Sequence, residues 1–141
     1  MKVNWGAIVV AAVVHFGFGA VWFTAFSKPW QAGTRMSPEE LQTYAAHPNL
    51  WAFLISFLCS LGIALVISWV MGVSCKYGLF RGVVTGLMIG IVAALAMVTE
   101  MTFEYRASSF MFISAAYPLI GSVLMGIVIG VWKPKGAEAV D

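Results

Sequence analysis

The stretch LWAFLISFLCSLGIALVISWVMGV, Leu50 to Val73, runs for 24 residues without a charged side chain. An α-helix rises about 1.5 Å per residue, so about 20 apolar residues cross a hydrocarbon core roughly 30 Å thick. A buried helix of a water-soluble domain rarely needs such a length of unbroken apolar sequence. The stretch therefore predicts a membrane-spanning helix.

Three further segments have the same character, and the composition of the whole chain agrees with them. Of 141 residues, 61% are hydrophobic and 10% are charged, against about a quarter charged in soluble domains. We predict an all-α integral membrane four-helix bundle, formed by one domain over residues 1–132 and followed by a short polar tail, 133–141. The predicted spans are 4–26, 50–73, 82–103 and 108–132. The first is too long for the hydrophobic region of a signal peptide and is expected to be retained.

Positive charge and tryptophan placement predict the orientation. Five lysines and arginines fall on the side of the two termini and three on the other side, which favours cytoplasmic termini. Tryptophan prefers the membrane interface, where its ring lies among acyl chains and its N–H reaches water. Each tryptophan lies near a predicted helix end: Trp5, Trp69 and Trp132 on the inner side, Trp22, Trp30 and Trp51 on the outer side.

One loop is long enough to contain a helix. In MSPEELQTYAAHPN, Ser37 can cap a helix, Pro38 suits the first position and Glu40 can complete a capping box. Pro48 ends it. We expect a short outer-face helix over 38–46, lying on the membrane surface or across the mouth of the bundle, where it covers helix ends or acts as a lid.

Small residues recur every four positions along each predicted span. Close backbone approach through such residues substitutes for the hydrophobic drive that lipid does not supply. We therefore predict that these ridges pack the bundle. Their glycines are Gly19, Gly82, Gly86, Gly90, Gly126 and Gly130.

His15 lies on the small-residue ridge of the first span, so it is expected to face a neighbouring helix. Ionisable groups inside a membrane are functional candidates by default. Two interpretations remain open. The imidazole is neutral and hydrogen-bonded across a helix interface, for example to Ser60 or Ser68, or it is a protonatable or ligand-binding group in a pathway.

The second polar group lies around the last turn of the third span. Glu100 follows Gly82 by eighteen residues, five helical turns, so we expect it to face the protein. Glu104 and Arg106 follow in a short turn. They are expected either to form an ion pair in a solvated turn or, with Glu100, to line the mouth of a cation or small-solute pathway. His15 and Glu100 differ in depth by about 12 Å and cannot pair directly.

The segment HFGFGAVWFTAFSKPW resembles the opening of a small bacterial membrane family catalogued as domain of unknown function 1761. The corresponding residues are Gly19, Trp22, Phe23, Lys28 and Trp30, with Arg106, Tyr117, Gly126 and Trp132 further along, and Phe23 stands where the pattern has tyrosine. His15 lies outside this pattern. The resemblance implies a four-helix protein of the bacterial inner membrane and supplies no activity.

Three classes of function remain. The first is a structural or accessory protein that acts through helix packing, as a homo-oligomer or in a larger membrane complex. The second is a small oligomeric transporter or channel for a proton, cation or small solute, using Glu100 and possibly His15. The third, an enzyme, is disfavoured because no catalytic motif is evident. We find no metal-ligand spacing, expect no cofactor and expect no nucleic-acid partner; the lipid bilayer is the expected surroundings.

Overall fold

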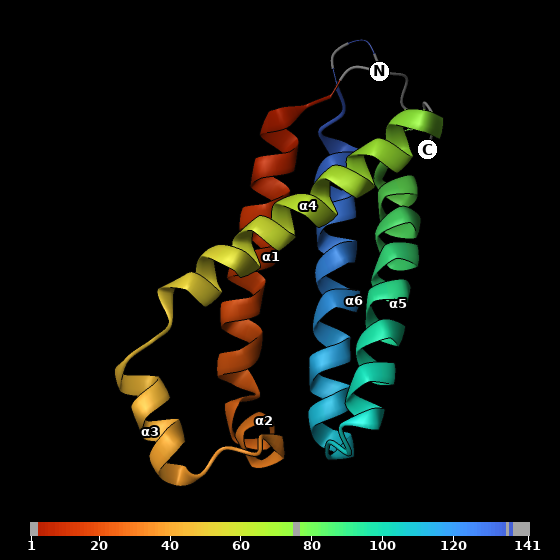
Figure 1. The fold of residues 1–141 in the computed structure, drawn as a ribbon. Helices are drawn as coiled ribbons and strands as arrows, with labels where there is room; N and C mark the ends of the chain where they lie inside the picture. Colours follow the sequence, from red (N-terminus) through yellow and green to blue (C-terminus); the bar gives the residue numbers. More distant parts are fainter. Residues whose placement is uncertain (1–2, 75–76, 135, 137–141) are drawn as a thin grey trace.

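The computed structural model describes residues 3–74, 77–134 and 136, and its regular elements there are helices (Figure 1). They are α1 (Trp5–Ala25), α2 (Ser27–Gly33), α3 (Pro38–Ala46), α4 (Leu50–Ser74), α5 (Leu79–Phe103) and α6 (Ser108–Val131). By length and apolar composition, α1, α4, α5 and α6 are able to cross a membrane. The predicted all-α fold with four membrane-spanning helices is confirmed.

Helix α6 is the centre of the bundle. Half of the residues in its most apolar 18-residue stretch are buried, compared with 17% in the corresponding stretches of α4 and α5. Helices α5 and α6 run side by side along their lengths, α1 lies on the other side of α6, and α4 crosses this layer obliquely (Figure 1). As a result, α4 and α5 keep broad apolar faces for lipid.

The start of α1 and the end of α6 lie at the same end of the bundle, here called the terminal end (Figure 1). Asn4 joins them. Its side-chain oxygen accepts the amide of Ala7 at 3.2 Å and so caps α1, while its amide donates to the carbonyl of Trp132 at 3.0 Å. One side chain thus satisfies exposed backbone groups of two helices.

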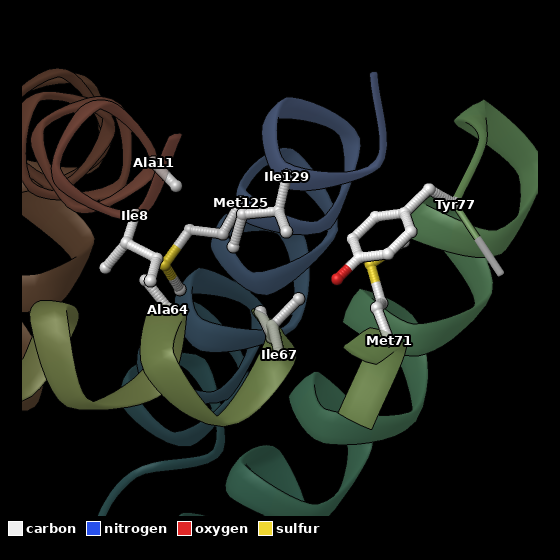
Figure 2. Packing of buried hydrophobic residues seen from close by; sticks show 8 residues of the cluster. All are labelled: Ile8, Ala11, Ala64, Ile67, Met71, Tyr77, Met125 and Ile129. Carbon is white, nitrogen blue, oxygen red and sulfur yellow. The ribbon is translucent and has the colours of Figure 1, made fainter. Parts of the chain in front are cut away.

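A cluster of apolar side chains fills the terminal half of the bundle (Figure 2). Met125 of α6 lies between Ile8 of α1 and Ile67 of α4, and the ring of Tyr77 lies beside Met71. Its other members are Ala11, Ala64 and Ile129, so the core is drawn from α1, α4 and α6 together with Tyr77, which precedes α5.

The α5–α6 contact depends on glycine. A methyl group on Gly82 would collide with the carbonyl of Gly126, and one on Gly90 would lie 2.8 Å from the carbonyl oxygen of Leu119. Gly86 meets Ser122 and Val123 in the same way. The main chains of the two helices are therefore in direct contact, as expected where small residues drive association in lipid.

The opposite end of the bundle is covered by α2, which the sequence analysis missed. Gly33 lies directly against Phe110 at the start of α6, and the ring of Trp30 stacks on Phe110 with centroids 5.8 Å apart. Arg35 donates to the carbonyl of Glu104, just beyond the end of α5. A cation at this position also opposes the negative end of the helix dipole.

Helix α3 has the predicted bounds and the predicted capping box. Ser37 accepts the amide of Glu40 at 3.2 Å, and the Glu40 carboxylate accepts the amide of Ser37 at 2.6 Å. This backbone hydrogen bond lowers the pKa of Glu40. However, α3 contributes no buried residue, so the expectation that it covers the helix ends is wrong; α2 does so instead.

The third long helix begins at Leu79, three residues before the predicted Gly82. The amide of Gly82 donates to the carbonyl of Gly78 at 2.9 Å, so residues 79–81 form a complete first turn. At the other end of α5, Tyr105 has φ 53°. Its amide donates to the carbonyl of Thr102, and the amide of Arg106 donates to the carbonyl of Met101. This is a Schellman motif with tyrosine where glycine is usual.

Substitution by alanine distinguishes the glycines that contact another helix from those that face open space. Gly86→Ala is expected to destabilise the protein by about 1–3 kcal/mol, because the methyl group has to push α6 away. Gly62→Ala is the matched control: Gly62 lies on α4 with no atom within 4 Å of an added Cβ. It is expected to be neutral or stabilising by up to about 1 kcal/mol. Thermal unfolding in detergent measures both, and equal stability would contradict the close α5–α6 contact.

Candidate functional site

His15 occupies the middle of α1 and is 4% exposed. It is the eleventh residue of a 21-residue helix, about 15 Å from either end. Its Nδ1 lies 2.9 Å from the hydroxyl oxygen of Ser60 on α4. The hydrogen bond to a serine across a helix interface, one of the two interpretations that the sequence left open, is therefore present.

Tyr117 of α6 is a second partner of His15. Its hydroxyl lies 3.2 Å from His15 Nδ1 and 3.4 Å from the His15 carbonyl oxygen, and the two rings have centroids 4.8 Å apart. Gly19, one turn further along α1, makes room for this ring: an added methyl group would lie 2.9 Å from the Tyr117 hydroxyl. His15, Ser60 and Tyr117, here called the polar joint, connect α1, α4 and α6.

The hydrogen-bond geometry favours one arrangement of protons. Ser60 can donate to the carbonyl of Ser56 at 2.9 Å, within its own helix. Its oxygen is then free to accept a hydrogen bond from the His15 Nδ1–H, and the Tyr117 hydroxyl can donate to the His15 carbonyl. This arrangement satisfies every donor of the polar joint, with the imidazole neutral and protonated on Nδ1.

The remaining ring nitrogen, Nε2, is buried without a hydrogen-bond partner. A methyl group on Gly121 of α6 would lie 2.7 Å from it. The adjacent Ser122 hydroxyl is also buried without a partner. An unpaired acceptor costs less than an unpaired N–H⁺ would in hydrocarbon, so the enclosure favours the neutral imidazole.

Aromatic side chains surround the polar joint on the side away from the terminal end. Phe23 and Phe18 of α1 lie 5.2 Å and 6.0 Å from the ring of Tyr117. The indole N–H of Trp22 donates to the carbonyl of Ile113 at 3.0 Å. This hydrogen bond attaches the α1 side chain to the α6 backbone five residues before Pro118.

These contacts change the interpretation of two tryptophans. Trp22 and Trp30 are half-buried against α6, whereas Trp5, Trp51, Trp69 and Trp132 are exposed as expected of interface anchors. Trp22 and Trp30 therefore contribute to helix packing as well as lying near the helix ends.

The second polar group lies apart from the polar joint. Glu104 and Arg106 form an ion pair at 2.8 Å, and the Arg106 guanidinium lies 5.4 Å from the ring centre of Phe110. Glu100 is exposed, so the expectation that it faces the protein is wrong. The half-buried residues near this end of α5 include Ala93, Met97 and Met101, which follow one another at intervals of four, and each interval turns about 40° further around the helix, away from Glu100.

Four membrane-length helices with hydrogen-bonded polar groups at mid-span define the class: an α-helical multi-pass membrane protein. Residues 6–130 match the family model described as "Protein of unknown function (DUF1761)", and the chain belongs to this family. No curated protein and no solved structure matches the chain in these comparisons.

Residues of the family-like pattern gather around the polar joint. Gly19 and Tyr117 form the α1–α6 contact, and Phe23 and Trp22 pack beside it. His15 lies outside the pattern but fills the space next to Gly121. Gly19 and Tyr117 are therefore part of the α1–α6 contact, to which His15 and Gly121 also contribute.

The polar joint can be tested by a double-mutant cycle. Gly121→Ala is expected to destabilise the protein because its methyl group meets the imidazole. His15→Asn removes the ring while keeping an amide able to bind Ser60. In the double variant much of the Gly121→Ala penalty should disappear, giving a coupling energy of about 1 kcal/mol or more. Additive unfolding free energies would contradict the contact.

Proposed function

We propose that this protein is a structural or accessory protein of the bacterial inner membrane, acting through helix packing as a homo-oligomer or in a larger complex. The observation that carries the proposal is the enclosure of His15. A group that moves protons or cations has to reach water or a solute in turn. His15 is instead surrounded by three helices, with Gly121 against its free nitrogen.

The other candidate pathway residues support the same proposal. Glu100 is exposed near the end of α5, Glu104 is paired with Arg106, and neither contributes to the polar joint. Helices α4 and α5 meanwhile keep apolar faces on which further spans can pack. A transporter would need an oligomer that places these separate groups on one path.

The composition and activity of a gently solubilised sample test this proposal. We expect a particle larger than the monomer, either a homo-oligomer or a complex with a stoichiometric partner. In liposomes it should give no flux of protons, alkali cations or organic cations. A monomeric particle without a partner would contradict the proposal. Flux that Glu100→Gln abolishes would replace it with the transporter.

We further propose that both termini face the cytoplasm, as the charge distribution and the positive-inside rule favour. In a variant with Cys59 and Cys75 replaced by serine, Gly136→Cys should resist a membrane-impermeant maleimide in intact cells. His47→Cys, in the connection between α1 and α4 at the end of the bundle away from the termini, should react. The reverse pattern would invert the orientation without affecting the fold.

A further inference from the structure

A hollow of about 310 Å³ lies between the start of α1 and the second half of α4. No charged side chain is among its six lining residues, and two tryptophans frame it. They are Val3, Trp5, Leu65, Val66, Ser68 and Trp69. We call it the Trp5–Trp69 groove.

The groove results from the oblique crossing of α4. The antiparallel helices α1 and α4 meet at Phe16 and Phe57, whose rings are 5.8 Å apart, and again at His15 and Ser60. The contact continues to the core cluster that contains Ile8 and Ile67. Beyond this point the two helices diverge toward the terminal end, which leaves a wedge between them (Figure 1).

The depth of the groove places it in the acyl region of one leaflet. Trp5 is the first residue of α1, and Trp69 is five residues from the end of α4. Leu65 is nine residues from the same end, about 13 Å along the helix. The groove therefore begins at the interface, where indole rings prefer to lie, and continues into hydrocarbon.

The size and lining of the groove suit a single hydrocarbon chain. The groove has a volume of about 310 Å³, and its lining is apolar except for the Ser68 hydroxyl and the two indole N–H groups. A helix would lie over this groove from outside, whereas a hydrocarbon chain is thin enough to enter it. Its burial against apolar side chains also leaves no polar group unsatisfied.

We propose that the Trp5–Trp69 groove binds one acyl chain of a bilayer phospholipid, with the glycerol and headgroup at the level of the two indole rings. The chain fills the wedge that α1 and α4 leave open and so completes their contact at the terminal end. This inference does not depend on the accessory or transport role of the protein.

A phosphatidylethanolamine with a diazirine on one acyl chain tests the proposal. In proteoliposomes, photolabelling of the wild-type protein is expected to concentrate on the α1 and α4 residues that line the groove. Leu65→Trp places a large ring in the groove and should abolish this labelling. Leu65→Ala, which enlarges the groove, should retain the labelling, so that its loss in Leu65→Trp reports filling of the groove and not the loss of leucine, while thermal unfolding in detergent checks that Leu65→Trp is folded.

Leu87→Trp is the matched control. Leu87 is 40% exposed on α5 and Leu65 is 39% exposed on α4, so the two substitutions change equally accessible leucines. Leu87→Trp should leave the groove label unchanged. Labelling spread evenly over the exposed faces of α4 and α5, or labelling of the groove that Leu65→Trp does not reduce, would overturn the proposal.

Discussion

The direct contact between the main chains of α5 and α6 is the interaction on which the rest of the bundle depends. Lipid hydrocarbon is as favourable a surrounding for an apolar side chain as the protein interior, so burying leucine or valine between helices adds little free energy of association. Close van der Waals contact has to supply the association energy. Gly82, Gly86 and Gly126 permit it by removing the side chains that would separate the helices.

With α5 and α6 joined, α6 presents its opposite side to α1 and α4. On that side, Tyr117 contacts His15 and Gly121 lies against the Nε2 atom of the same histidine. Met125, further along, belongs to the apolar core. Lipid offers no hydrogen-bond partner, so the polar groups at this depth have to satisfy one another. The polar joint thereby gives α1 and α4 defined positions on α6, where apolar packing alone would allow them to slide.

The two ends of the bundle use different means to the same effect. At the terminal end, the Asn4 side chain joins α1 to α6 by hydrogen bonds to the backbone of Ala7 and Trp132, and the diverging helices leave the Trp5–Trp69 groove. At the opposite end, α2 packs on Phe110. Arg35 donates to the Glu104 carbonyl in the turn after α5, and the Arg106 guanidinium lies over the ring of Phe110. Helix α3 buries no side chain and so stays outside this packing. Its capping box stabilises it locally.

The sequence by itself determined the class of the protein, the four spans and the capped helix over 38–46, and it offered a hydrogen bond from His15 to a serine as one of two interpretations. These follow from local rules: hydrophobic length, capping chemistry and the need to satisfy a polar group in lipid. The tertiary structure alone decided that Tyr117 is the second partner of His15, that α2 covers the bundle and that Glu100 is exposed. Tyr117 and His15 are 102 residues apart, and no periodicity connects them. The direction of Glu100 depends on how the α5–α6 contact winds along the helix, and only the packed pair of helices sets that winding.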